Sequence, residues 1–210
     1  MGRSPFVRDE AKQRLREAVQ SVEARSSAEI VVAVQPWSAS WSAVDGSFGA
    51  ALAYVTLLYT LFAPEEFGLT WIALMVPAAF VVGLVLCRAL PGLRMRLAGR
   101  GRVRRAVEQG ARARFVELGV SATRERSGVL VYVSIAERVC VVVPDVGVVA
   151  RVPKDAWAKA AARVQDAVAM HGVSEAGLAA LCEAVQALAE VLEPPMPRRE
   201  DDTNELEDVA

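Results

Sequence analysis

Two acidic residues stand where predicted strands end, and oxygen ligands at such positions could bind a hard cation. Glu137 and Asp145 each follow a short apolar run that predicts a strand. In open α/β sheets a ligand sits outside the carboxyl ends of parallel strands, which places Gln35 and Ser134 near Glu137. Carboxylates bind Ca²⁺, but a calcium site normally has six or more oxygen ligands. Two interpretations follow for Glu137 and Asp145: a calcium site, or a turn acid and a strand-end acid.

Two further side chains could take part in chemistry. Arg126 either binds an anionic group bidentately or pairs at the surface with Glu125 or Glu137. His171 immediately precedes Gly172, a place where the helix dipole favours a basic residue. The sequence contains no phosphate-binding loop, dinucleotide fingerprint, G-x-S-x-G elbow or C-x-x-C pair. No residue is therefore assigned a catalytic role.

Two long uncharged runs form the strongest pattern in the chain. The run 68–87 contains no Asp, Glu, Lys, Arg or His, and at about 1.5 Å per residue it can cross a hydrocarbon core of about 30 Å. The run 46–63 is shorter, and only residues 64–67 connect the two, which predicts a tight antiparallel pair of helices. We predict a transmembrane helical hairpin over residues 44–88, with membrane lipids as partners along 46–87. The alternative is a buried helical hairpin in a large soluble core.

The charged residues predict which side of the membrane each end faces. Seven arginines and no acidic residue lie between Arg88 and Arg105, whereas the loop between the runs carries Glu65 and Glu66. Cytoplasmic loops are rich in arginine and lysine. We therefore expect an integral protein of the cell (inner) membrane with both termini and the soluble part in the cytoplasm.

Tryptophans and arginines flank the runs where the headgroups would lie. Tryptophan is enriched at membrane interfaces, and each basic residue beside a span attracts anionic headgroups by about 1 kcal/mol. No aromatic residue is interleaved with the arginines, so a nucleic acid partner is not expected. The predicted lipid-facing residues are Trp37, Trp41, Trp71, Arg88, Arg94 and Arg96.

Outside the runs, the hydrophobic period alternates between helix and strand. The predicted strands are 28–34, 128–133 and 139–143, and the predicted helices end near Ala24, Gly119, Gly172 and Pro194. A strand, crossover helix, strand order gives a parallel pair, and the following hairpin adds an antiparallel strand. We predict a three-layer α/β/α sandwich with a small mixed sheet, interrupted after the first strand by the transmembrane hairpin.

The predicted organisation divides the chain into four parts. Residues 1–43 and 102–193 form the α/β domain around the hairpin, and 194–210 form an acidic disordered tail or a docking strap. The chain has 210 residues, 53% of them hydrophobic, with a formal net charge of −1. Its cysteines lack the spacing of metal ligands and suit reduced thiols, so neither disulfide nor zinc is expected. No basic and apolar leader stands at the N-terminus, so no cleaved signal peptide is expected.

Several of these segments together resemble the TPM domain family. They are the strand AEIVVAV at 28–34, the run TRERSGVLVYVS at 123–134, Glu137 with Arg138, Asp145 with Gly147, and the tail DDTNELED. The resemblance implies a role in the assembly or quality control of membrane protein complexes, with acid phosphatase activity and calcium binding in some members. Phosphatase-like members carry an acidic cluster after the first strand, where this chain has only Asp45.

The sequence thus favours a membrane-anchored, non-catalytic interaction factor whose partners are other membrane proteins. The motivation is the hairpin together with the lack of a catalytic constellation. The alternative is a weak, calcium-linked acid phosphatase that would use Glu137 and Asp145.

Overall fold

The computed structural model describes residues 4–198, 206, 208 and 209. The chain divides into two compact units. One unit, called here the α/β unit, comprises Met1–Ser38 and Arg105–Ala210; the other, the hairpin unit, comprises Ala39–Arg104. The hairpin unit is wider than the predicted 44–88 because an additional helix, α4 (Pro91–Ala98), belongs to it.

The α/β unit is built on a three-stranded mixed sheet in the order β1-β2-β3. Its strands are β1 (Glu29–Gln35), β2 (Gly128–Ser134) and β3 (Val139–Pro144). β1 and β2 are parallel along their whole length, and β2 and β3 form an antiparallel hairpin. The predicted mixed α/β fold and the three strand positions are confirmed to within one residue at each end.

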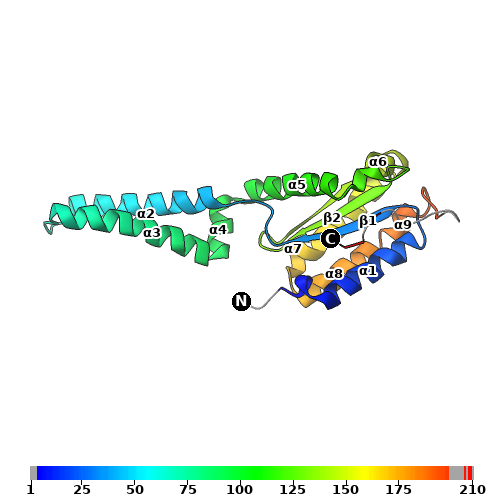
Figure 1. Cartoon of the computed structure of the whole chain (residues 1–210), viewed down its shortest axis with the longest axis horizontal. Helices are drawn as coiled ribbons and strands as arrows, with labels where there is room; N and C mark the ends of the chain where they lie inside the picture. Colours follow the sequence, from blue (N-terminus) through cyan, green and yellow to red (C-terminus); the bar gives the residue numbers. More distant parts are fainter. Residues whose placement is uncertain (1–3, 199–205, 207, 210) are drawn as a thin grey trace. The chain divides into compact units, whose positions relative to one another are not determined.

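Helices pack against both faces of this sheet because β1 and β2 are apolar on both faces. Alternate residues point to opposite sides: Ile30 and Val32 pack with α1 (Asp9–Glu23), α7 (Lys154–His171) and α8 (Glu175–Gln186). Val31 and Ala33 pack with Val107 and Ala111 of α5 (Arg100–Glu117). Figure 1 shows the strands between α5 and the pair α1 and α8.

Several boundaries differ from the prediction for local reasons. Ser4 and Pro5 have the residue types of a helix start, but a 3₁₀ turn, η1 (Pro5–Val7), precedes α1 and Ser4 makes no side-chain cap. Ser174 does cap α8, since its hydroxyl accepts the Gly177 N–H at 3.2 Å. In the α/β unit three further short helical elements were not predicted, namely η2 (Val120–Ala122), α6 (Val146–Arg151) and α9 (Ala189–Leu192).

Residues 194–210 were predicted to form a disordered tail or a docking strap, and the described ones pack against the α/β unit as a strap would. Met196 is 2% exposed in the main core, and its carbonyl accepts the Ser27 N–H at 3.0 Å. Pro197 forms a bridge with Ser26, and Val209 forms one with Val32. Backbone bonds and buried apolar side chains hold these residues, which polar composition alone does not reveal. Residues 199–205, 207 and 210 lie outside the described part.

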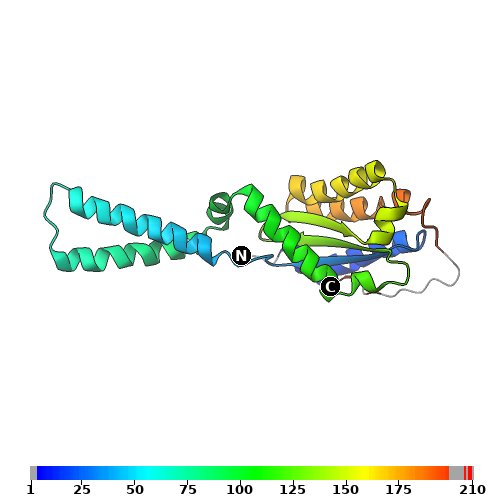
Figure 2. The ribbon, with the colours of Figure 1, turned by 90° about the horizontal axis from the view of Figure 1, so that it is seen from above.

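The hairpin unit consists of two long helices and a short one. α2 (Ser42–Phe62) and α3 (Leu69–Ala89) lie side by side in opposite directions, and α4 follows α3 at once (Figures 1 and 2). Two glycines allow the close crossing of α2 and α3. A Cβ on Gly83 would come within 2.9 Å of the Gly49 Cα, and one on Gly49 within 2.8 Å of the Phe80 carbonyl oxygen. Small residues at such contacts let helix backbones approach closely.

Candidate functional site

The most concentrated chemistry of the hairpin unit is an ion cluster around Asp45. Asp45 lies in the first turn of α2, where the helix dipole favours an acid, and is fully buried. The Arg94 Nε donates to Asp45 Oδ1 at 2.7 Å and its second nitrogen donates to the other carboxylate oxygen. Arg88 Nε donates to Asp45 Oδ2 at 3.2 Å. This cluster ties the end of α3 and the whole of α4 to the start of α2.

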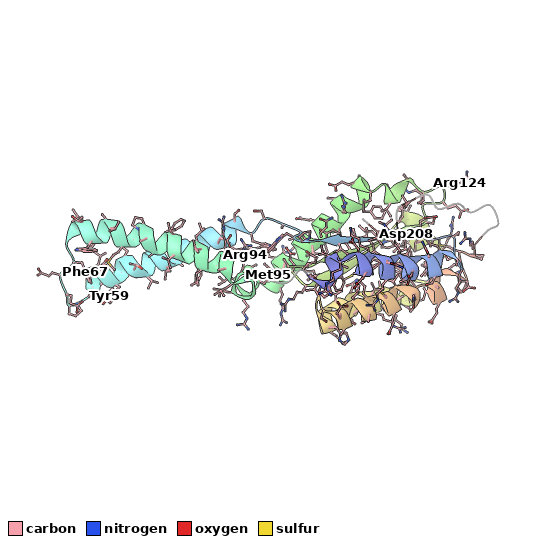
Figure 3. All side chains as sticks on the ribbon, turned by 60° about the horizontal axis from the view of Figure 1, so that its bottom comes forward. Tyr59, Phe67, Arg94, Met95, Arg124 and Asp208 are labelled. Atoms are coloured by element: carbon pink, nitrogen blue, oxygen red, sulfur yellow. The ribbon has the colours of Figure 1, made fainter. Side chains whose placement is uncertain are left out.

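Two arginines of the predicted lipid-facing set are therefore engaged by an acid of their own unit. The side chain of Arg94, labelled in Figure 3, is only 13% exposed and bonds to Asp45, so its assignment as lipid-facing is wrong. Arg88 also bonds to Asp45, but its side chain stays more than half exposed. Arg96 is exposed. The sequence signal for this arrangement was the single acid at the start of an otherwise uncharged run.

The three tryptophans have different surroundings. Trp71 on α3 is 63% exposed, and Trp37 in the α/β unit is about half exposed. Trp41, which directly precedes α2, is only 5% exposed, so the prediction that it faces lipid is wrong. At the far end of the hairpin the rings of Tyr59 and Phe67 meet with centroids 6.0 Å apart (Figure 3). This tilted pair closes the connection between α2 and α3.

The large apolar side chains of the hairpin point outward. α2 and α3 are long and apolar enough to cross a membrane, and of their most apolar stretches only 22% and 6% are buried. Apart from Val44, the residues buried in the two helices are small or polar, namely Asp45, Gly49, Thr60, Gly83 and Cys87. Large exposed apolar patches mark sites of protein or membrane contact. The exposed apolar side chains of the two helices include Tyr54, Val55, Leu58, Leu61, Phe62, Leu69, Leu74, Val81, Val82, Val85 and Leu86.

In the α/β unit, Glu137 lies at the carboxyl ends of β1 and β2. It is 7% exposed, accepts a hydrogen bond from the Ser134 hydroxyl, and accepts the Ser38 N–H at 3.3 Å. The Ser38 and Tyr132 hydroxyls lie 3.2 Å apart at the same edge. Gly110 of α5 adjoins them, since a Cβ there would come within 3.0 Å of the Tyr132 hydroxyl. Glu137 thus joins the turn after β2 to the segment after β1.

Asp145 directly follows β3 and lies at the opposite end of the strands from Glu137. Its carboxylate accepts hydrogen bonds from the Arg126 Nε at 2.8 Å and from a second Arg126 nitrogen at 3.1 Å. The same carboxylate accepts the Val146 N–H at 2.7 Å and thereby caps α6. The carboxylate raises the pKa of the Arg126 guanidinium above its ordinary value. The predicted ion pair of Arg126 at the surface is present, but its partner is Asp145 in place of Glu125 or Glu137; Glu125 bonds to Arg151 at 2.7 Å. Arg126 has a φ of 56°, and Gly147 N–H donates to its carbonyl at 3.0 Å.

The two carboxylates proposed to share a calcium ion therefore do not meet. β3 runs antiparallel to β2, so the residue after β3 lies beside Gly128, whose carbonyl accepts the Asp145 N–H at 2.8 Å. Glu137 follows Ser134 at the other end of β2. Seven residues of strand separate the two ends by roughly 20 Å. The shared site at Glu137 and Asp145 is wrong, and among the described residues no group of three His, Cys, Asp or Glu side chains could hold a metal.

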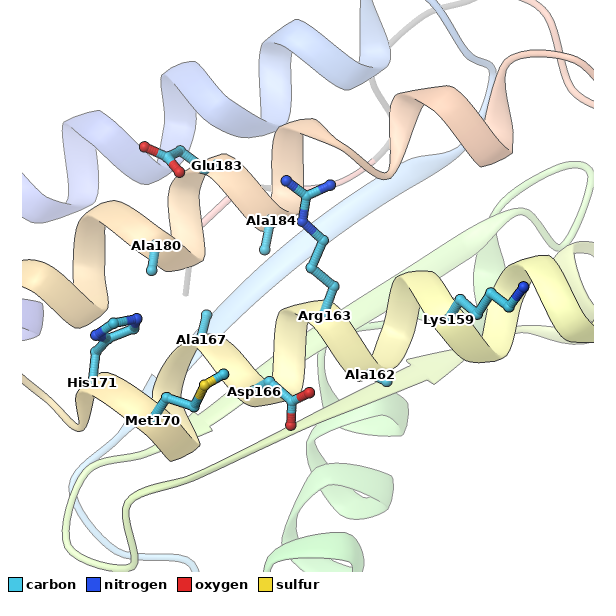
Figure 4. A pocket seen from close by; sticks show the side chains of 10 residues that line it. All are labelled: Lys159, Ala162, Arg163, Asp166, Ala167, Met170, His171, Ala180, Glu183 and Ala184. Carbon is cyan, nitrogen blue, oxygen red and sulfur yellow. The ribbon is translucent and has the colours of Figure 1, made fainter.

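A groove of about 470 Å³ runs between α7 and α8. Figure 4 shows small alanines at its floor and charged residues around it, with His171 at one end. His171 is the last residue of α7 and is followed by Gly172 with a φ of 64°, as predicted for a helix end. The Ser174 hydroxyl donates to the His171 carbonyl at 2.8 Å. The groove is wide open, and charged side chains from both helices line it.

The two units together define a class of protein: a small mixed α/β unit with an apolar two-helix hairpin placed in sequence between its first two strands. No protein-family model and no curated protein matches the chain. The solved NMR structure of the BA42 protein from the psychrophilic bacterium Bizionia argentinensis is similar, with a TM-score of 0.57 and 16% identity. The match covers 99% of this chain and 95% of that one. At this identity the similarity concerns the fold alone.

Proposed function

We propose that the chain is a membrane-anchored interaction factor that binds other membrane proteins and acts in their assembly or quality control. In this proposal α2 and α3 cross the cell (inner) membrane as a hairpin. The α/β unit is then a TPM-like three-layer sandwich in the cytoplasm, interrupted by the hairpin after β1. Arg96, Arg100 and Arg102, all exposed, would lie at the cytoplasmic headgroups.

One observation carries this proposal: the hairpin exposes its large apolar side chains on both helices and encloses glycines and an ion cluster. A helix in a soluble core buries most of its apolar surface, whereas the larger part of the most apolar stretches is exposed here. In lipid such exposure is favourable, and small residues at the helix contact supply the packing. The arginines after α3 and the acids of the 64–67 loop supply the charge asymmetry of the positive-inside rule.

The anchoring is tested by alkaline carbonate extraction of membranes that contain the full chain. We expect the protein in the pellet, and a tag at either end to be protected from a protease added outside intact cells. Recovery in the carbonate supernatant, or labelling of the tags from outside, would refute the membrane topology. The interaction role is tested by crosslinking in native membranes. A result without any reproducible membrane-protein crosslink would count against that role alone.

The alternative, a calcium-linked acid phosphatase, has less support from the geometry. Glu137 and Asp145 lie at opposite ends of the strands, and both carboxylates already accept hydrogen bonds within the chain. The distinguishing measurement is phosphate release by the purified chain in micelles with and without Ca²⁺. Activity that is lost in Glu137→Gln or Asp145→Asn, and that Ca²⁺ increases, would favour the enzyme over the interaction factor.

A further inference from the structure

The outer edge of β1 is an open strand edge in the α/β unit. In the order β1-β2-β3, β1 pairs with β2 on one side only. Its residues Ile30, Val31 and Val32 are apolar and β-branched, and each is buried by helices on the faces of the sheet. A flat apolar edge of this kind is a template on which another extended segment can add as a strand.

Two different groups cover this edge in the structure. Near its start, the Ile30 N–H donates to the Glu23 carboxylate at 3.1 Å. Two residues further along β1, the Val32 N–H donates to the Asp208 carbonyl at 2.9 Å, and Val209 forms a parallel bridge with Val32. Figure 3 labels Asp208 beside the sheet. The first cover is a side chain of α1, and the second is an added strand from the far end of the sequence.

The added segment has the side-chain pattern of a strand that straddles the edge. Leu206 packs against the apolar cluster beneath α5, and Val209, 9% exposed, packs into the core beneath α1. Residues an odd number of positions apart point to opposite faces of an extended segment. The Asp208 carboxylate also accepts the Gln20 Nε2 at 3.2 Å. The edge thus offers one apolar site on each face, a backbone N–H between them and an amide donor on α1.

Among the described residues this cover is short. The bridge to Val209 is an isolated one outside the named strands, while β1 continues beyond Val32 to Gln35. Main-chain hydrogen bonds give affinity in strand addition, and pockets for alternate side chains give specificity. A segment that uses a single bridge and two aliphatic side chains can be exchanged for a longer one with the same pattern.

We propose that the outer edge of β1 is a peptide-docking site, which Leu206, Asp208 and Val209 occupy within the chain and which an extended segment of a partner protein occupies in their place. The partner segment has two aliphatic residues three positions apart with an acidic residue directly before the second, and it runs parallel to β1. The inference rests on the proposed function, because it names the surface by which the α/β unit binds its partner.

The first test releases the covering segment in the full chain held in detergent micelles. The double variant Leu206→Ser with Val209→Ser removes both aliphatic contacts, and amide hydrogen exchange is followed residue by residue. We expect exchange at Val32 to accelerate at least tenfold. Exchange at Ile30 is the internal control and should not change, because Glu23 still covers that amide. A matched variant, Val146→Ser with Val149→Ser on exposed positions of α6, should leave Val32 unchanged.

The second test supplies the segment as a separate molecule. A labelled synthetic peptide of residues 200–210 should bind the double variant at least tenfold tighter than the unmodified chain, whose own segment competes at a high effective concentration. The peptide should also restore slow exchange at Val32, and a peptide with Leu206→Asp and Val209→Asp should not bind.

Three results would overturn the proposal. The first is unchanged Val32 exchange in the double variant, and the second is a peptide that binds without protecting Val32. The third is a dimer of the unmodified chain that the double variant abolishes, which would assign the edge to a second copy. If the docking tests fail while crosslinking still captures membrane proteins, the docking site is wrong and the proposed function stands. If carbonate extraction fails, the anchor is wrong whatever the peptide does.

Discussion

The two units arrange the same kinds of residue in opposite ways. In the α/β unit, α8 turns Leu178, Leu181 and Val185 into the core. In the hairpin unit, α3 turns Trp71 and Leu74 outward and buries glycine and cysteine against α2. The hairpin unit also encloses the ion cluster of Asp45.

This reversal shows which solvent each unit suits. Water favours burial of large apolar side chains, by about 25 cal/mol per Å² of apolar surface. Lipid gives no such advantage, so helices in lipid associate through close backbone contact and polar bonds. The crossing of Gly49 and Gly83 and the bonds to Asp45 are contacts of that second kind. The first three predictions change one residue type in both units, and the last two concern the α/β unit alone.

The largest expected effect comes from arginine on exposed apolar positions. Leu74→Arg with Val81→Arg on α3 should oppose membrane insertion by about 5 to 7 kcal/mol, at about 2.5 to 3.5 kcal/mol for each charge near a helix centre. We expect the double variant to leave the carbonate pellet. Met170→Arg with Val149→Arg, on exposed positions of the α/β unit, should stay in the pellet. Equal behaviour of the two double variants would contradict the difference in solvent.

The next effect is the loss of the buried acid in the hairpin unit. Asp45→Asn leaves Arg94 buried opposite a neutral amide, and removing one member of a buried ion pair costs about 3 to 5 kcal/mol. Because Cys87 is fully buried and hydrogen-bonds to Asp45, a loosened cluster should expose its thiol. We expect a maleimide to label Cys87 at least tenfold faster in micelles. Asp145→Asn in the other unit is the control and should leave this rate unchanged.

Truncation of a leucine should affect the two units differently. Leu181 is fully buried in the main core, so Leu181→Ala should cost about 2 to 5 kcal/mol of unfolding free energy. Leu61→Ala on an outward position of α2 should change the unfolding free energy in micelles by less than about 0.5 kcal/mol. Urea unfolding followed by circular dichroism measures both. A costly Leu61→Ala would mean that protein, and not lipid or detergent, covers that position.

A smaller effect is expected at the cap of α6. Asp145→Ala removes the acceptor of the Val146 N–H, and loss of such a cap costs about 1 kcal/mol. Arg126→Ala should cost less unfolding free energy, because the Arg126 side chain is half exposed and the variant leaves the Asp145 cap intact. The same urea measurement ranks the two variants. An Arg126→Ala variant as unstable as Asp145→Ala would mean that the ion pair, and not the cap, holds α6.

The sequence predicted the elements of both units well, because apolar periodicity is local information. The runs around Val31 and Val131 gave the strands, and the uncharged stretch around Val81 gave α3. It missed α4, whose sequence PGLRMRLA has no consistent apolar face. In α4, Arg94 bonds to Asp45, which lies 49 positions earlier in the sequence. Local periodicity does not reveal such a distant partner.

The candidate site was predicted less well because it depends on which ends of strands meet. Glu137 was placed at the correct edge, beside Gln35 and Ser134. Asp145 was added to that edge although β3 runs the other way, and strand direction separates the two acids. The docked position of Val209 on β1 could not be predicted, because one bridge to a distant residue leaves no periodic signal.

The smallest effect concerns a thiol of the α/β unit and its dependence on pH. Burial raises the pKa of the Cys140 thiol from its ordinary 9.0 to about 12. The unfolded chain therefore releases this proton near pH 9, whereas the folded chain keeps it, so rising pH favours unfolding between the two values. From pH 9 to 10 the stability should fall by about 1 kcal/mol more in the unmodified chain than in Cys140→Ala. Urea midpoints at pH 7.5, 9 and 10 measure this, and equal pH slopes would show that water reaches Cys140 in the folded core.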